Sequence, residues 1–329
     1  NNLGKPIIGQ LGNGQWYVMV GNGPNSSGDS ADLVLVNILS GVSSDISTGA
    51  AGDNGLSSVL AWSSNNDYIV DRIYAGDLNG NLWRFDMTGA SGTATRLFTA
   101  QYGSKTQPIT AAPTAAKDPS TGSTWVFFGT GKYLSDGDLS NKDVQTWYGL
   151  IDRGREIGSD RSTLNKVDIE EQGTVNGYTV RVIEDQPSPG VDGWYMDLVP
   201  PSGTAEGERM VVSNFFQGTA LIGTTRIPDS GDVCSPSGKG FVMAINPFTG
   251  GRMPQSFFDL DGSGGSSTGD TLNGKPASGI GLDSSPNSPI FIGNQMQIGL
   301  DNASTVGIGT NSSALSMKRV SWRELLRND

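Results

Sequence analysis

One pattern recurs along most of the chain and limits the folds that it can adopt. A short run of β-branched or aromatic residues is followed by a Gly-rich turn and then by a second run that ends in Asp or Asn. Such paired runs are typical of antiparallel hairpins. The first runs are residues 16–21, 72–76, 125–129, 219–223 and 290–293, and the second runs are residues 33–37, 81–86, 147–152 and 240–246.

These hairpins recur at intervals of roughly 50 to 90 residues, which fits propeller blades that carry loop insertions. A single hairpin cannot bury both of its faces until neighbours stack on it. The runs amount to about five blades, and propellers usually close with four to eight, so an incomplete ring is one reading of this count. We therefore predict an all-β propeller, with a β-sandwich as the alternative.

The rhythm breaks between residues 153 and 200, where we expect an insertion into the propeller. Within it, the polar stretch around residues 164–172 predicts one short helix, and residues 178–199 predict a hairpin. The insertion is either a blade loop enlarged for contacts or a solvated excursion. The basic and amphipathic tail at residues 318–327 is expected to dock on the domain or on a partner.

Charge and composition exclude several classes of function. The net charge of -11 argues against nucleic acid and anionic lipid as partners, because both reward Lys and Arg, and it favours cations. The absence of histidine removes the commonest general base and a usual zinc ligand, which excludes Ser and Cys triads. The sequence contains no apolar run of about 18 residues, so it predicts no membrane-spanning helix. Cys234 is the only cysteine, so no internal disulfide is possible.

Loop one, residues 63–71, is the first candidate for a metal site. Oxygen ligands recur there at alternate positions, as a tightly curved calcium loop requires, and position 7 offers a backbone carbonyl. The usual Gly at position 6 is replaced by Tyr68, and no Glu closes position 12. Its candidate ligands are Ser63, Asn65, Asp67, Ile69 and Asp71.

Loop two, residues 259–270, is the second candidate and follows the sequence rule for calcium loops more closely. Ser stands at position 5, and Asp replaces Glu at position 12. An acidic, Gly-rich loop that only keeps the surface polar is the alternative. Its candidate ligands are Asp259, Asp261, Ser263, Gly265, Ser267 and Asp270, with Gly264 at the bend.

Two further groups of residues suggest carbohydrate chemistry. The acidic pairs Asp77 with Asp86 and Asp136 with Asp138 could serve a glycosidase, although turns are rich in Asp for structural reasons. The tryptophans could line a sugar-binding surface, although Trp in strands more often belongs to the core. These tryptophans are Trp16, Trp125, Trp147 and Trp194.

Four segments resemble a known family. Residues 70–86, 127–134, 246–251 and 319–325 are similar to the PilY/PilC family of type IV pilus biogenesis factors and tip adhesins. The resemblance implies a modified, quinoprotein-like β-propeller, with residues 1–329 as the C-terminal part of that domain. It also implies a secreted protein that passes through the periplasm to the pilus tip, cell surface or outer membrane. Expected partners are minor pilins, and a host or abiotic surface through a separate N-terminal region.

In that family the calcium loop reads Asp, Asn, Asp, a backbone carbonyl and Asp at alternate positions. Carried over to this chain, four positions match in loop one, namely Asn65, Asp67, Ile69 and Asp71. Ser63 replaces a carboxylate, which removes one negative charge and should weaken Ca²⁺ binding. The resemblance thus predicts a calcium-binding module that supports pilus extension against retraction and attachment to surfaces, and no enzyme.

Two other functions remain alternatives. A quinoprotein-like dehydrogenase shares propeller blades and calcium, but it typically needs eight blades and often adjacent cysteines. A carbohydrate-binding, lectin-like propeller is the second alternative, and glycan binding by the isolated domain would separate it from a role in pilus assembly.

Overall fold

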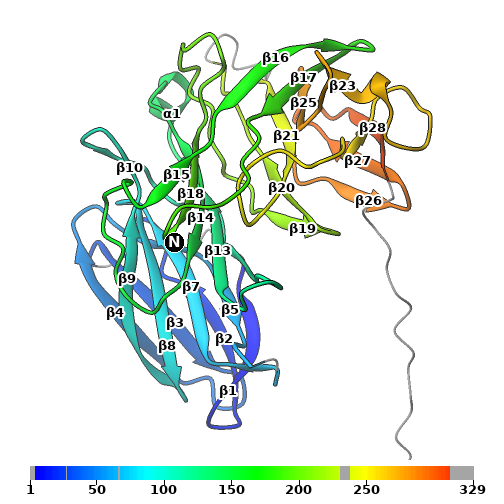
Figure 1. Cartoon of the computed structure of the whole chain (residues 1–329). Helices are drawn as coiled ribbons and strands as arrows, with labels where there is room; N and C mark the ends of the chain where they lie inside the picture. Colours follow the sequence, from blue (N-terminus) through cyan, green and yellow to red (C-terminus); the bar gives the residue numbers. More distant parts are fainter. Residues whose placement is uncertain (1–3, 27, 66, 230–237, 312–329) are drawn as a thin grey trace, which may run out of the picture.

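The computed structural model describes residues 4–26, 28–65, 67–229 and 238–311. Nearly all regular structure in this part of the chain is β, as predicted, and it forms five main antiparallel-rich sheets. Figure 1 shows that the sheets succeed one another along the chain, from the blue and cyan strands at one end of the molecule to the orange strands at the other. Cys234 and the basic tail lie outside the described residues.

The first and second sheets contain the N-terminal strands. Sheet 1 has the order β4 (Ser43–Ala51), β3 (Ser30–Asn37), β2 (Trp16–Gly21), β1 (Ile7–Leu11) and β6 (Ile69–Val70). Sheet 2 has the order β5 (Leu56–Trp62), β7 (Arg72–Asp77), β8 (Asn81–Thr88) and β9 (Ser91–Thr99).

The third, fourth and fifth sheets follow. Sheet 3 has the order β12 (Thr114–Lys117), β13 (Thr124–Gly129), β14 (Thr146–Ile151), β18 (Gly193–Asp197) and β15 (Leu164–Lys166). Sheet 4 has the order β16 (Ile169–Val175), β17 (Tyr178–Ile183), β25 (Gly279–Leu282), β21 (Gly240–Ile245), β20 (Ala220–Thr224) and β19 (Phe215–Gln217). Sheet 5 has the order β22 (Phe258–Asp259), β28 (Thr305–Thr310), β27 (Gln295–Gly299) and β26 (Ile290–Ile292).

Short elements connect these sheets. They are the hairpin β10 (Gln101–Tyr102) with β11 (Lys105–Thr106), the hairpin β23 (Thr271–Leu272) with β24 (Lys275–Pro276), the single-turn helix α1 (Gly137–Ser140) and the 3₁₀ turn η1 (Thr268–Asp270). No helix within the described ranges is long and apolar enough to cross a membrane.

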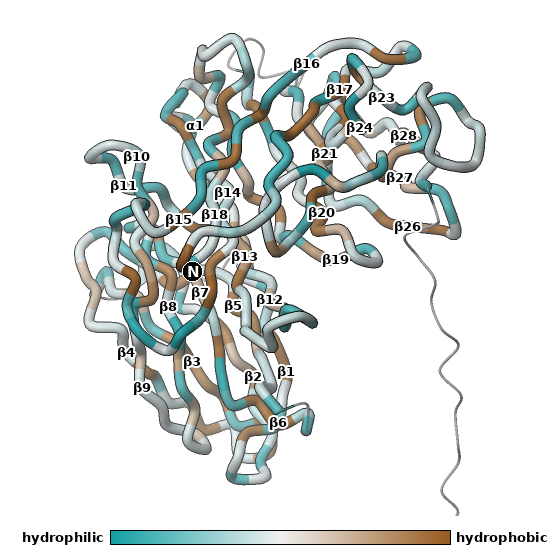
Figure 2. The backbone as a smooth tube through the Cα atoms, viewed as in Figure 1, coloured by the Kyte–Doolittle hydropathy of each residue, from teal (hydrophilic) through white to brown (hydrophobic). Residues whose placement is uncertain are grey.

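Four apolar clusters lie between successive sheets, which is how propeller blades stack. One cluster joins sheets 1 and 2, and the next joins sheets 2 and 3. The remaining two join sheets 3 and 4, and sheets 4 and 5. Figure 2 shows the hydrophobic residues mainly along strands and the hydrophilic ones mainly in loops. The sheets do not close into a ring, because the first and fifth lie at opposite ends of the molecule (Figure 1).

Strand β13 shows how the sequence produces this stacking. Trp125 and Phe127 belong to the core between sheets 3 and 4, whereas Val126 and Phe128 belong to the core between sheets 2 and 3. Successive side chains of a strand point to opposite faces, so a continuous apolar run fits a strand that is buried on both faces. The paired runs of the sequence form these strands, and β2–β3, β7–β8, β13–β14 and β20–β21 all pair antiparallel as predicted.

The segment between residues 153 and 200 differs from expectation in two ways. The helix predicted around residues 164–172 is wrong, because the chain forms strand β15 and begins strand β16 there. The predicted hairpin of residues 178–199 is also wrong, although both of its strands exist. Strand β17 pairs with β16 and β25 in sheet 4, whereas β18 pairs with β14 and β15 in sheet 3.

Candidate metal centre

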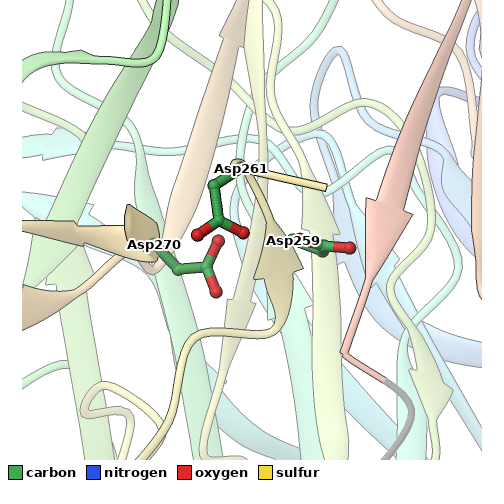
Figure 3. Close-up of side chains that lie close together, drawn as sticks. All are labelled: Asp259, Asp261 and Asp270. Atoms are coloured by element: carbon green, nitrogen blue, oxygen red, sulfur yellow. The ribbon is translucent and has the colours of Figure 1, made fainter. Parts of the chain in front are cut away.

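Loop two links β22 to β23 and brings three carboxylates together. Asp259 ends strand β22, Asp261 lies just beyond it, and Asp270 ends the 3₁₀ turn η1. One oxygen atom from each lies within 4.8 Å of the others. Figure 3 shows the carboxylates of Asp261 and Asp270 turned toward each other, with Asp259 beside them. The structure therefore gathers the acidic residues that the spacing selected.

Backbone N–H groups hold loop two in a tight bend. The amide of Ser263 donates to Asp259 Oδ1 at 3.1 Å and to Asp261 Oδ1 at 2.9 Å, and the amide of Gly264 donates to Asp259 Oδ2 at 3.0 Å. Gly264 has a φ of 78°, in the left-handed region where glycine is favoured. The bend thus occurs at position 6 of the register, where calcium loops also use glycine.

Asp261 and Asp270 differ in exposure and in their hydrogen-bond donors. The hydroxyl of Ser267 donates to Asp261 Oδ2 at 2.5 Å, and this bond, with those from Ser263, lowers the pKa of Asp261 to about 2. Asp270 is fully buried and accepts the amides of Leu260 at 2.6 Å and Ser267 at 3.0 Å. Asp261 is therefore an exposed carboxylate held in its charged form, and Asp270 is a structural anchor as well as a candidate ligand.

The oxygen set of loop two fits a hard cation. Calcium takes six to eight oxygen ligands, and affinity rises with the number of charged ligands. Besides the three carboxylates, loop two offers the hydroxyls of Ser263 and Ser267 and the carbonyl of Gly265 as candidate ligands. The Gly265 carbonyl accepts the Ser263 hydroxyl at 2.8 Å. Repulsion between close carboxylates is reduced by a bound cation, so the cluster suits Ca²⁺ chemically.

Loop one joins β5 to β6 and gathers fewer of its candidates. The Ser63 hydroxyl lies 3.2 Å from Asn65 Oδ1 and 3.0 Å from Asp67 Oδ1, and the amide of Ile69 donates to Asp67 Oδ1 at 2.8 Å. This amide and the Asn65 side chain lower the pKa of Asp67. Tyr68 takes a left-handed φ of 66°, so a non-Gly residue makes the bend at position 6.

Asp71 makes other contacts than the remaining ligands of loop one. Its Oδ1 accepts the backbone amide of Ser64 at 3.0 Å, and its Oδ2 accepts the Ser64 hydroxyl. The Lys117 ammonium donates to the carbonyl of Ser64, so a positive charge stands beside the loop. Ile69 lies in β6 and pairs with Gln10. Three of the five predicted ligands, Ser63, Asn65 and Asp67, are thus joined by direct hydrogen bonds. The positive charge of Lys117 repels a cation that approaches the loop.

The acidic pairs do not have the geometry of a glycosidase site. Asp77 and Asp86 lie at opposite ends of the β7–β8 hairpin, since Asp86 faces Arg72 in the register. Five residues of strand separate them by about 17 Å, beyond the roughly 5 to 9.5 Å between paired glycosidase carboxylates. Asp77 is fully buried and accepts Asn81, Asn54 and the Trp83 indole, which gives it a structural role.

In the second acidic pair, Asp138 is committed to local structure. Asp136 precedes α1, and Asp138 is buried and accepts the amides of Leu134 and Ser135, both at 2.9 Å. Of the four tryptophans proposed for a sugar surface, three are core residues. Trp16 is 54% exposed, whereas Trp125, Trp147 and Trp194 are buried to within 1%.

One polar cavity was not predicted from the sequence. It is lined by hairpin β10–β11, the loop of residues 132–145 and Arg209, which are separated by up to a third of the chain. No local sequence motif predicts such a site, because its residues come together only through the packing of sheets 2, 3 and 4.

Comparison with known proteins assigns the fold to a family. The family model of the PilY1 beta-propeller domain matches residues 1–177. The chain belongs to this PilY1 family. Its resemblance to PilY/PilC proteins is thereby confirmed, together with the propeller fold.

Similar PilY1 proteins extend the match to nearly the whole chain. A "Type IV pilus biogenesis factor PilY1 homolog" from Xylella fastidiosa (strain Temecula1) is 54% identical over 328 residues, covering 99% of this chain and 27% of the relative. "Type IV pilus biogenesis factor PilY1" from Pseudomonas aeruginosa (strain UCBPP-PA14) is 31% identical over 338 residues, covering 85% of this chain and 29% of the relative. The chain therefore spans under a third of the length of these relatives.

A solved PilY1 structure has the same fold. The crystal structure of the Pseudomonas aeruginosa PilY1 C-terminal domain matches with a TM-score of 0.79 at 25% identity, covering 94% of this chain and 72% of that one. The described sheets thus have the arrangement of a PilY1 C-terminal domain.

Proposed function

We propose that this chain is a calcium-responsive module of a type IV pilus-associated protein. A cation bound in a loop between strands fixes the neighbouring face, and a partner at the pilus reads that face. The observation that carries the proposal is the convergence of Asp259, Asp261 and Asp270 within 4.8 Å, in a register chosen from sequence spacing alone. Binding there changes a conformational population only by its preference for one state over another.

Loop two is proposed to bind Ca²⁺ more tightly than loop one. Loop two offers three carboxylates, whereas loop one offers two, of which Asp71 is bonded to Ser64. Lys117 adds a positive charge beside loop one. Since affinity in such loops follows the number of charged ligands, the order of the two sites should be the reverse of the one that family resemblance favours.

The setting of this module is proposed from its relatives. The PilY1 proteins that it resembles are described as type IV pilus biogenesis factors. We place the chain in a secreted protein at the pilus tip or cell surface, where it works with minor pilins and supports pilus extension and surface attachment. A binding role is favoured over an enzymatic one because the members of the first candidate acid pair lie far apart and Asp138 of the second pair is committed to local structure.

Calorimetric titration of the metal-free 329-residue chain with Ca²⁺ tests the binding. Asp261→Asn removes one of three carboxylates from loop two, and we expect Ca²⁺ affinity to fall by about tenfold or more. Asp71→Asn should change the total binding heat little, and Asp45→Asn, at an exposed position on β4, is the matched control. Absence of binding at millimolar Ca²⁺ would remove the proposal.

The same variants test the pilus role when introduced into a full-length relative of this family. We expect the loop-two variant to reduce the number of surface pili, and the Asp45→Asn variant to leave it unchanged. Unaltered piliation combined with lost Ca²⁺ binding would separate the metal from pilus function and refute the regulatory part of the proposal.

A further inference from the structure

A cavity of about 640 Å³ lies beside hairpin β10–β11, and we call it the hairpin pocket. The turn between β7 and β8 contributes Leu78, the hairpin contributes residues 102–106, and the loop around α1 contributes Lys132, Asp138 and residues 141–145. Arg209 completes the lining. Figure 1 shows α1 and β10 on the same side of the molecule. The volume of the hairpin pocket lies within the range of sites for small organic ligands, roughly 300 to 1,000 Å³.

The hairpin pocket is basic although the protein is acidic. Four cations line it, against the two carboxylates Asp138 and Asp143. Asp143 is paired with Lys105 at 2.5 Å, and Asp138 lies 3.7 Å from the Lys132 ammonium. Lys142 forms no ion pair with any residue that the structure describes. The lining therefore carries a positive excess that selects an anionic ligand. The four cations are Lys105, Lys132, Lys142 and Arg209.

Arg209 supplies a positive charge that the fold leaves without a carboxylate contact. Its side chain is only 2% exposed, and its guanidinium donates to the carbonyls of Lys132, Asp138 and Asn141 at 2.9, 2.9 and 2.6 Å. Burial lowers the pKa of Arg209, and the charge of Asp138 opposes that effect. Because the hydrogen bonds of this buried cation all go to carbonyl oxygens and none to a carboxylate, its charge favours the approach of an anion from the pocket.

Gln145 adds an acceptor that needs a donor. Its Oε1 is buried and has no hydrogen-bond partner among the described residues, and the residue is only 7% exposed. Leaving a buried acceptor unpaired costs about 1 to 3 kcal/mol. A chloride or sulfate ion cannot satisfy Gln145 Oε1, because at neutral pH it carries no hydrogen to donate. The ligand therefore needs a hydroxyl or N–H group as well as a negative charge.

The rim of the hairpin pocket adds a half-exposed aromatic ring. Tyr102 is 47% exposed, and the Arg161 guanidinium carbon lies 5.8 Å from its ring centroid. The apolar face of a pyranose ring packs well on such a surface. The net charge of -11 repels long polyanions, which leaves ligands with one or a few charges.

We propose that the hairpin pocket binds an acidic saccharide. The sugar carboxylate is held by Lys142 in the field of Arg209, a sugar hydroxyl donates to Gln145 Oε1, and the ring rests against Tyr102. This site is independent of calcium and of both loops.

Calorimetric titration of the whole chain in chelator tests the site without contribution from Ca²⁺. The probes are glucuronic acid and N-acetylneuraminic acid, with glucose as the uncharged match for the first. We expect both acids to bind and glucose to bind at least about tenfold more weakly, since charge-assisted hydrogen bonds are roughly twice as strong as neutral ones. Inorganic phosphate and an acidic peptide are titrated in parallel.

Two variants separate the pocket from general electrostatics. Lys142→Met should weaken the binding of both acids about tenfold, whereas Lys275→Met, a lysine outside the pocket, should leave it unchanged. Gln145→Leu should weaken binding severalfold while leaving stability unchanged or raised, because it removes an unpaired buried acceptor. A purely structural Gln145 would instead lose stability.

Several outcomes would overturn the proposal. These are no binding of either acid, equal binding of glucose, equal effects of the two lysine variants, and phosphate binding as tight as that of the acids. Binding of the acidic peptide in the absence of saccharide binding would assign the pocket to a protein partner instead.

Discussion

Arg181 and Glu208 form the most deeply buried ion pair among the described residues. Both side chains are fully buried, and the guanidinium donates to the two Glu208 oxygens at 2.7 and 2.8 Å. Thr225 adds a hydrogen bond to Glu208 at 2.6 Å, and the Phe241 ring lies 3.4 Å from the guanidinium carbon. The pair links β17 to the chain segment that precedes β19, so it places two opposite charges in the interior of the protein.

Neutralising one partner of this pair should destabilise the fold. Glu208→Gln leaves the Arg181 charge buried without compensation, and we expect the free energy of unfolding to fall by about 3 to 5 kcal/mol. Urea denaturation followed by tryptophan fluorescence measures the change. The double variant Arg181→Met with Glu208→Gln removes both charges and should recover part of the loss. If the double variant were no more stable than Glu208→Gln, the buried charge would not be the cause.

At the level of elements, the strands were predictable because their signal is local. The run of residues 124–129 is buried at every position, and its β-branched and aromatic side chains fit a strand between two cores. The misassigned stretch carried a signal too. In β16, burial alternates from Ile169 to Val175, which is the period of a strand, but its polar composition suggested a helix.

The antiparallel pairs between neighbouring runs were predictable from the sequence, but the partners of β17 and β18 were not. Strands β17 and β18 follow each other closely, yet each joins a different sheet, because the central apolar strands of sheets 3 and 4 offer them separate edges. The candidate metal ligands were also predictable only in part. Spacing selected Asp259, Asp261 and Asp270 correctly as neighbours, whereas the diversion of Asp71 to Ser64 depends on the path of the loop.

The turn between β12 and β13 offers a pH test at the scale of one element. Asp118 accepts the Ser120 amide at 2.9 Å and the hydroxyls of Ser120 and Thr121, both at 2.7 Å. Burial raises the pKa of Asp118, but these bonds outweigh it and lower the pKa below its ordinary value. Since the folded-state pKa is depressed, the turn contributes stability above pH 3.8, and this contribution is lost as the pH falls further.

Thr121→Val should therefore raise the Asp118 pKa toward its ordinary value and cost about 1 kcal/mol at pH 7. The difference in unfolding free energy from the unsubstituted chain should shrink as the pH falls below 3.8, because the Thr121 hydroxyl bonds more weakly to protonated Asp118 than to its carboxylate. Carboxyl ¹³C NMR gives the pKa, and urea titrations at several pH values give the stability. Thr121→Ser keeps the hydroxyl and should behave like the unsubstituted chain; equal shifts in both variants would contradict the argument.

At the scale of the whole molecule, the fold separates its candidate sites. Loop one lies beside β6 in sheet 1, the hairpin pocket lies among sheets 2, 3 and 4, and loop two lies at sheet 5. Figure 2 shows β6 and β28 at opposite ends of the molecule. Because each apolar core joins only two adjacent sheets, a ligand at one end stabilises directly the sheets that it touches. Calcium at loop two should act first on sheets 4 and 5.

Binding at loop two should nevertheless raise the melting temperature of the whole chain if the stacked sheets unfold together. At a free Ca²⁺ concentration about 100-fold above Kd, the stabilisation is about 2.7 kcal/mol. With an unfolding entropy of about 2.1 cal/mol/K per residue, a chain of 329 residues should gain about 4 °C. Differential scanning calorimetry in Ca²⁺, in Mg²⁺ and in chelator measures this shift.

The two cations should differ because Mg²⁺ requires near-octahedral geometry and gives up water reluctantly, whereas Ca²⁺ accepts the irregular oxygen set of a loop. Asp261→Asn should reduce the Ca²⁺ shift by about half or more, because a site weakened tenfold contributes only about 1.4 kcal/mol at the same Ca²⁺ concentration, and Asp45→Asn should preserve the full shift. A single transition that moves only with Ca²⁺ means that the five sheets transmit the binding energy as one unit. If only a minor, separate transition moved, the sheets near loop two would be unfolding on their own, and a metal there could not control a partner bound at the far end. Equal shifts with Mg²⁺ or in Asp261→Asn would place the effect outside loop two.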